Sequence, residues 1–181
     1  MMPDKKTLRA LVRAQTEALP QSYLDEADRA IMQKLLESHE YKSAERVFAY
    51  YSVGREVSTH KIIERALSDG KRVALPVSLP GGKMLFREIR DTECLRPGAY
   101  GIPEPDESCA PMECRSGDLV LVPAVSCDAK GSRLGRGAGY YDRFLQDRDC
   151  VSVCLMRSAL MQESIPTDAH DVPVKLVINE K

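Results

Sequence analysis

The chain opens with two stretches in which apolar residues recur at the spacing of an amphipathic helix. The first stretch predicts a helix over residues 4–18, with Asp4 in front of it as a candidate cap. Pro20 interrupts the pattern, and the second stretch predicts a helix over residues 21–38. The apolar positions are Leu8, Leu11, Val12 and Leu19 in the first stretch and Leu24, Ala27, Ile31, Leu35 and Leu36 in the second.

Beyond these helices the hydrophobic period changes. Short apolar runs predict strands at residues 46–52 and 72–77. Between them, residues 58–70 begin with a Ser/Thr capping signal and end at Gly70, which predicts a helix. A strand, a helix and a strand at this spacing form a βαβ unit, so the two strands should be parallel with a right-handed crossover.

The remaining segments extend the same sheet. Strands are predicted at residues 83–89, 150–156 and 174–179, whereas residues 96–108 contain too much proline and glycine for a regular element. Residues 118–128 are apolar almost throughout, which is typical of a central strand buried on both faces. The expected fold class is therefore α/β, with a mostly parallel sheet, helices on both faces and an α-helical N-terminal segment.

Composition narrows the class of protein. A length of 181 residues favours one domain spanning residues 1–181, and a net charge of −1, from 26 basic and 27 acidic residues, argues against a nucleic-acid-binding protein. The sequence shows neither an apolar run long enough to cross a membrane nor a signal peptide, so we expect no membrane partner and a cytoplasmic location.

None of the six cysteines forms a C-x-x-C pair, and Cys127 is expected to be a buried, inert thiol. A monomer is favoured, although nothing in the sequence sets the oligomeric state.

The segment RLGRGAGYYDRFL, residues 133–145, carries the strongest chemical signal. It follows the most apolar strand and precedes a short helix expected to begin near Tyr140, and ligands of open α/β sheets bind at the carboxyl ends of strands. Its glycine backbone can approach an anion closely, while Arg133 and Arg136 add donors suited to phosphate or carboxylate. The spacing matches neither G-x-G-x-x-G nor the P-loop, and the alternatives are an anion cradle and a structural turn. The three glycines in question are Gly135, Gly137 and Gly139.

The helix that follows this loop has two faces. Tyr141, Phe144 and Leu145 stand at helical spacing and should face the core, which leaves Tyr140 directed toward the loop and a flat ligand. Asp142 lies in the first turn, where it is either a carboxylate that matches the helix dipole or a ligand for Mg²⁺.

Two weaker signals lie elsewhere. Lys5 and Arg9 are one helical turn apart and share a face, an arrangement more often found on a solvated surface. Glu56 lies between a predicted strand and a predicted helix, where sheet enzymes often place polar groups. Nothing in the sequence spacing supports His60 or His170 as acid–base groups.

Taken in order along the chain, these segments resemble the 5-formyltetrahydrofolate cyclo-ligase family. The resemblance implies a three-layer α/β/α fold of the type shared with ribose-phosphate isomerases and CoA transferases. It also implies a reaction in which MgATP and 5-formyltetrahydrofolate give 5,10-methenyltetrahydrofolate, ADP and phosphate through a phosphorylated formyl group. The matching segments are KKTLR, YYSVGREVSTHKII, LPV, GIPEP, LVLVPAVSCDAKGSRLGRGAGYYDRFL and IPTDAHD.

The resemblance further implies roles for individual residues. Arg136 is implied as the catalytic residue, and Asp142 as a magnesium ligand. The implied folate contacts are Tyr51, Glu56, Arg136, Gly137, Ala138, Gly139 and Tyr140. The implied ATP-binding residues are Lys5, Lys6, Thr7, Leu8, Arg9, Arg133, Leu134, Gly135, Arg136, Gly137, Ala138, Gly139, Tyr140 and Tyr141.

One position departs from the family pattern. Some members carry a second acidic magnesium ligand where Lys175 stands here, so either a water or one of Asp168 and Asp171 would take its place. Lys175 itself either offsets phosphate charge or is a lysine at a strand edge. Three rival interpretations therefore remain open: an enzyme of the same fold acting on a sugar phosphate or CoA thioester, a non-catalytic relative that binds nucleotide or folate, and a structural α/β domain.

Overall fold

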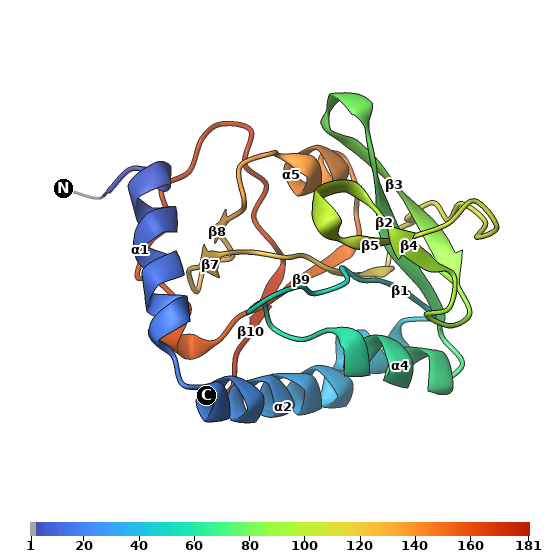
Figure 1. Ribbon diagram of the computed structural model, residues 1–181, viewed down its shortest axis with the longest axis horizontal. Coiled ribbons are helices and arrows are strands. Elements are labelled where there is room, and N and C mark those ends of the chain that lie inside the picture. The colour runs from blue at the N-terminus through green and yellow to red at the C-terminus, as the bar shows by residue number, and fades with distance from the viewer. Residues whose placement is uncertain (1–2) are drawn as a thin grey trace.

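A six-stranded, mostly parallel sheet forms the centre of the molecule (Figure 1), which a computed structural model describes for residues 3–181. The strand order is β10-β9-β6-β1-β2-β3, and only β3 is antiparallel to its neighbour. The adjacent parallel strands β1 and β2 confirm the predicted βαβ unit. The strands are β1 (Arg46–Phe48), β2 (Arg72–Leu79), β3 (Lys83–Ile89), β6 (Leu119–Leu121), β9 (Val151–Leu155) and β10 (Leu176–Ile178).

Helices cover both faces of this sheet, as predicted. α2 and α4 lie together along one face, and α5 lies on the other, toward the side of the molecule where α1 stands (Figure 1). Each face has its own apolar core: residues of α2, α3 and α4 pack into one, and residues of α1 and α5 into the other. The helices are α1 (Lys5–Ala18), α2 (Gln21–Glu37), α3 (His39–Ser43), α4 (His60–Ser68) and α5 (Tyr140–Leu145).

The two cores explain why the central strands are apolar at every position. In β6, Leu119 and Leu121 point into the core beneath α2 and α4, whereas Val120 points into the core beneath α1 and α5. Successive side chains of a strand face opposite sides, so a strand covered on both faces has no position that favours a polar residue.

The N-terminal helices agree closely with the sequence pattern. Asp4 caps α1 by accepting a hydrogen bond from the Thr7 N–H at 2.7 Å, as predicted. The predicted stripe of α2 supplies its buried residues. The five-residue helix α3 was not predicted, because it is too short to show a helical period. Among the described residues, no helix is long and apolar enough to span a membrane.

The predicted start of the helix over residues 58–70 was wrong by two residues, since α4 begins at His60. Thr59 occupies the cap position, but its hydroxyl donates to the Tyr50 carbonyl at 2.6 Å and makes no capping hydrogen bond. The same oxygen accepts the Ser52 N–H at 3.1 Å. The buried threonine therefore fastens the segment after β1 to the start of α4.

Three predicted segments differ from the structure. Residues 118–128 do not form one strand, because β6 ends before Pro123 and the chain enters a separate two-stranded ribbon of β7 (Ser126–Cys127) and β8 (Arg133–Leu134). The residues of this run beyond β6 are apolar because they are buried, although they do not pair with the central sheet. Cys127 is fully buried, as predicted, and a hydrogen bond with Cys154 together with burial raises the pKa of its thiol.

The other two corrections concern strand length and a loop. Residues 46–52 form a strand only as far as Phe48, after which the chain leaves the sheet. Residues 96–108 are not a simple loop, because β4 (Leu95–Pro97) pairs with β5 (Pro103–Pro105) around a 3₁₀ turn. Proline suits these strands, since a two-stranded ribbon leaves half of its N–H groups without a ladder partner.

Candidate active site

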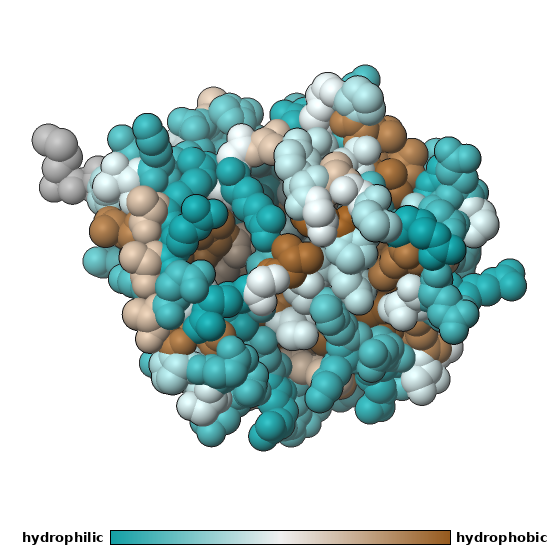
Figure 2. Space-filling view, viewed as in Figure 1, coloured by the Kyte–Doolittle hydropathy of each residue, from teal (hydrophilic) through white to brown (hydrophobic). Residues whose placement is uncertain are grey.

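A cavity of about 470 Å³ opens where the parallel strands β1, β2 and β6 end. Figure 2 views the molecule from the same side as Figure 1 and shows brown apolar residues recessed among teal polar ones. The walls come from α1, the segment after β1, the end of β2, the β4–β5 ribbon, and residues 133–142 and 168–171. Distant parts of the chain thus meet at the sheet edge where α/β enzymes bind ligands.

The glycine loop forms one wall of this cavity. Gly137 and Gly139 have φ angles of 106° and 69°, values that L side chains rarely adopt, so their conformation favours glycine. Gly135 lacks a positive φ, and a Cβ there would make only an ordinary contact, 3.4 Å from the Arg133 guanidinium. Arg9 donates from its Nε to the Gly135 carbonyl at 2.7 Å, which fastens α1 to the loop.

Each lysine and arginine of the cavity contacts an acceptor, which for Lys5, Arg9 and Arg136 comes from a distant segment of the chain. Arg133, which is almost fully buried, pairs with Asp142 at 2.7 Å, and Arg136 pairs with Glu56 at 2.6 Å. The Arg136 side chain remains 54% exposed. These cations therefore lie at the cavity wall with their charges balanced by neighbouring carboxylates.

Lys5 joins α1 to residues 168–171. Its Nζ lies 2.6 Å from Asp168 and 2.5 Å from Asp171. Burial lowers the pKa of Lys5, but the two carboxylates outweigh burial and leave that pKa raised. The pKa of Asp171 is lowered for the matching reason, because hydrogen bonds from Lys5 and the Asp168 N–H outweigh its burial.

Acidic groups of the cavity suit a hard cation. The Oδ1 atom of Asp142 accepts from Arg133 and, at 3.1 Å, from the Val172 N–H. Asp168, His170 and Asp171 offer ligand atoms that all lie within 4.8 Å of one another. Carboxylate oxygens are the ligands that Mg²⁺ prefers, and Mg²⁺ bound with phosphates takes only one or two of them, so these residues fit the ion.

Two buried polar atoms of the cavity wall have no hydrogen-bond partner within residues 3–181. They are the Nε of Arg133 and the hydroxyl of Tyr141. Burial raises the pKa of Tyr141, so the hydroxyl stays protonated at neutral pH. Both atoms are donors, and a buried donor without a partner favours an acceptor from a bound ligand or water.

Aromatic side chains line the cavity rim. The hydroxyls of Tyr140 and Tyr100 lie 3.5 Å apart, and this contact raises the pKa of Tyr140. Tyr100 sits on the turn of the β4–β5 ribbon with a positive φ of 58° and is 76% exposed. Tyr51 stacks on His60 with ring centroids 4.2 Å apart.

The structure brings most of the predicted site residues together. Lys5, Arg9, Tyr51, Glu56 and all residues from Arg133 to Asp142 line the cavity. On α1, Lys6 and Thr7 are exposed to solvent, while Leu8 packs in the core. The sequence prediction had not included Ser78, Met84, Tyr100, Ile102, Glu104 and His170, which also line the cavity. Tyr100, Ile102 and Glu104 belong to residues 96–108, whose high proline and glycine content was the one sequence signal that could have found part of this set.

Lys175 lies away from the cavity, at the start of the edge strand β10. Its Nζ pairs with Asp149 at 2.6 Å, and both side chains are largely exposed. This is the position that the strand-edge interpretation predicts. Because Lys175 does not line the cavity, the departure from the family pattern at this position leaves the residues of the cavity wall unchanged.

Comparison with known proteins identifies the family of this chain. The sequence model of the 5-formyltetrahydrofolate cyclo-ligase family matches residues 1–180. The 5-formyltetrahydrofolate cyclo-ligase of Haemophilus influenzae is 32% identical over 172 residues, which cover 90% of this chain and 89% of that protein. The probable 5-formyltetrahydrofolate cyclo-ligase of Schizosaccharomyces pombe is 30% identical over 188 residues, covering 94% and 92%.

A solved structure has the same fold. The NMR structure of Aquifex aeolicus 5,10-methenyltetrahydrofolate synthetase aligns with a TM-score of 0.84 and 28% identity over 98% of this chain and 90% of that one. Sequence and structure therefore agree over nearly the whole length, and the chain belongs to the 5-formyltetrahydrofolate cyclo-ligase family.

Proposed function

We propose that this protein uses MgATP to close 5-formyltetrahydrofolate to 5,10-methenyltetrahydrofolate, releasing ADP and phosphate. One observation carries the proposal: in a member of this family, a glycine loop, four lysine or arginine residues, five acidic residues and five tyrosines converge on one cavity. The cations and the loop suit a triphosphate, whereas the acidic and aromatic groups suit a pterin. The cavity volume of about 470 Å³ lies within the usual range of a small-molecule site.

The nucleotide phosphates would lie against the loop and the first helix. Backbone N–H groups near Gly137 and the side chains of Arg133, Arg9 and Lys5 can neutralise and orient them. Asp142 would hold Mg²⁺, which would supply positive charge to neutralise the phosphates. Asp171 is the proposed second carboxylate, because it lines the cavity where Lys175 does not.

The folate would lie toward Glu56. The Glu56 carboxylate lines the cavity and can accept hydrogen bonds from N–H donors of a pterin ring. Tyr51 and Tyr140 offer flat faces for stacking against a ring system. Arg136, paired with Glu56 at 2.6 Å, lies between the proposed phosphate and pterin ends.

The proposed chemistry needs positioning more than covalent help from the protein. The N5-formyl oxygen attacks the γ-phosphorus, ADP leaves, and the formyl carbon becomes an electrophilic imino-phosphate. N10 then attacks that carbon, its proton leaves and phosphate departs, which closes the ring. Arg136 would balance the charge on the transferred phosphoryl group while the loop holds both reactants in line.

The rival functions differ in what they require of the cavity. An enzyme for a sugar phosphate or CoA thioester would use the cations but has no need of Glu56 beside two tyrosines. A non-catalytic relative would bind the same ligands without turnover. The sequence argument for such a relative was Lys175, which pairs with Asp149 and does not line the cavity, and this supports the catalytic proposal.

The experiment is an assay of the purified protein with 5-formyltetrahydrofolate and MgATP, following methenyl absorbance and ADP release together. Equal amounts of both products support the proposal, and no ATP-dependent product overturns it. Arg136→Ala should abolish most turnover while changing the free energy of unfolding by less than about 1 kcal/mol, because its ion pair is exposed. Arg65→Ala is the matched control, since Arg65 is 55% exposed in an ion pair with Asp69 outside the cavity, and it should leave turnover unchanged.

A further inference from the structure

Arg157 is a buried arginine that lies outside the cavity wall. It follows β9, and only 2% of its surface is exposed. A buried guanidinium is costly to desolvate, and well-packed apolar residues often replace such groups without loss of stability. Its presence here is therefore poorly explained by stability alone, and its contacts indicate another role.

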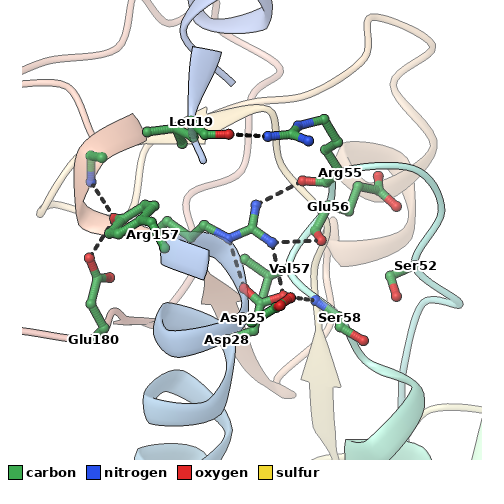
Figure 3. A network of polar contacts seen from close by, with 12 residues as sticks. Leu19, Asp25, Asp28, Ser52, Arg55, Glu56, Val57, Ser58, Arg157 and Glu180 are labelled. Atoms are coloured by element: carbon green, nitrogen blue, oxygen red, sulfur yellow. Dashed lines mark hydrogen bonds and ion pairs between the residues drawn. The ribbon is translucent and has the colours of Figure 1, made fainter. Parts of the chain in front are cut away.

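The hydrogen bonds of the Arg157 side chain go to one carboxylate and to the main chain of one short segment (Figure 3). Nε and one terminal nitrogen donate to the two carboxylate oxygens of Asp28 on α2, at 2.7 and 2.9 Å. The terminal nitrogens also donate to the carbonyls of Arg55 at 2.8 Å and Glu56 at 3.0 Å. Four hydrogen bonds from one planar group fix the position of the Glu56 main chain relative to β9 and α2.

Asp28 adds a further contact to the same segment. Its carboxylate accepts the Ser58 N–H at 2.9 Å, so the arginine and the aspartate hold residues 55–58 from two directions. This segment belongs to neither a helix nor a strand, and side chains must supply the partners that a regular element would give its backbone. Without the pair, the carbonyls of Arg55 and Glu56 would lose the partners that orient them.

The outward side of the segment faces the cavity. Glu56 directs its carboxylate there, with one oxygen accepting the Val53 N–H at 2.9 Å and the other pairing with Arg136. The position of that carboxylate therefore depends on main-chain atoms held by Arg157. A displacement of about 1 Å at a binding group can cost roughly a hundredfold in rate or affinity.

We propose that Arg157, oriented by Asp28, is a positioning residue that sets the Glu56 carboxylate for recognition of the pterin ring. The inference rests on the proposed function, since it names the pterin as the ligand of Glu56. Lysine cannot replace arginine in this role, because an ammonium group lacks the planar fork that reaches a carboxylate and two carbonyls at once.

The test compares Arg157→Lys with a matched buried pair at the other end of the sheet. Arg46 contacts both oxygens of Asp118, at 2.8 and 2.6 Å, with little exposure, and it lies at the start of β1, away from the cavity. Arg157→Lys should weaken 5-formyltetrahydrofolate binding by roughly tenfold to a hundredfold without weakening MgADP binding. Arg46→Lys should change neither affinity by more than about twofold.

A double-mutant cycle separates positioning from a general effect on folding. If Arg157 acts through Glu56, then Arg157→Lys should have no further effect on folate affinity in a Glu56→Gln background. A full additional loss in that background would overturn the inference. An equal loss of folate and MgADP affinity, or the same loss in Arg46→Lys, would overturn it as well.

Amide hydrogen exchange tests the same idea without any ligand. Arg157→Lys should speed exchange of the amides of residues 53–58, whereas Arg46→Lys should not. If Arg157→Lys does not fold, Asp28→Asn, which keeps the guanidinium and the side-chain volume, takes its place in every measurement. A wild-type protein that binds no 5-formyltetrahydrofolate would refute the proposed function, and unchanged exchange at residues 53–58 would refute the positioning role.

Discussion

Replacing Glu56 with glutamine should shift the affinities of the two proposed ligands in opposite directions. Glutamine keeps the side-chain volume and an acceptor for the Val53 N–H, but it removes the charge that pairs with Arg136 at 2.6 Å. Phosphate would then no longer compete with a carboxylate for the Arg136 guanidinium. The pterin, in contrast, would lose a charged acceptor.

The magnitudes follow from exposure and charge. The Arg136 side chain is 54% exposed, so its pair with Glu56 is worth at most about 1 kcal/mol, which corresponds to a gain of up to about fivefold in MgADP affinity. A hydrogen bond to a charged group contributes about 1.5–3 kcal/mol, so 5-formyltetrahydrofolate affinity should fall by roughly tenfold or more.

A fluorescent ADP analogue measures the first effect well, because the chain contains no tryptophan to interfere with its signal. Calorimetric titration with 5-formyltetrahydrofolate measures the second. The gain in nucleotide affinity should shrink at high ionic strength, since salt screens an exposed pair. Weaker nucleotide binding by Glu56→Gln, or a gain that persists when Arg136 is also replaced by alanine, would refute the reasoning.

Three further changes test other parts of the structure. Burial raises the pKa of Glu180, but hydrogen bonds from two hydroxyls outweigh burial and lower this pKa to about 2. The ionised carboxylate therefore stabilises the fold above its ordinary pKa of 4.5, and this contribution is lost as the pH falls toward 2. Glu180→Gln should therefore cost roughly 1–2 kcal/mol in urea unfolding at neutral pH and progressively less in acid, and a pH-independent difference would contradict this. Gly131→Ala should destabilise by about 1–3 kcal/mol more than Gly70→Ala in thermal unfolding, because both glycines have a positive φ but only a Cβ at Gly131 would lie 2.3 Å from the Val174 carbonyl oxygen; equal costs would contradict the clash. Asp142→Asn should cost about 1–3 kcal/mol in urea unfolding, since its arginine partner is buried, and should abolish the magnesium dependence of ADP binding; an unchanged dependence would exclude Asp142 as a ligand.

Local pattern was sufficient for much of the fold. The two N-terminal helices and β3 were predicted nearly residue by residue, and the βαβ unit was predicted in type and order, because amphipathic period and capping residues act within a few positions along the chain. The prediction failed at residues 118–128, where the apolar run continues past the end of β6. An apolar run indicates that a segment is buried, but it does not distinguish a strand of the sheet from a buried turn.

An anion cradle at the glycine loop was predicted from the sequence, beside a structural turn, since glycine and arginine in alternation suit an anion. The partners of those cations were not. Lys5 and Asp171 are 166 residues apart, Arg136 and Glu56 are 80 apart, and Arg157 and Asp28 are 129 apart. No local pattern relates residues at such separations, because the path of the chain through the sheet decides which of them meet.

The sequence by itself thus determined the type of most elements and, through the order of its motifs, the family. Only the tertiary structure decided which carboxylate faces which cation, that Lys175 lies outside the cavity, and that Arg157 holds the main chain of Glu56. The physical reason is that residue type fixes what a side chain can donate or accept. Its partner is fixed by burial and geometry, which exist only once the strands are in order.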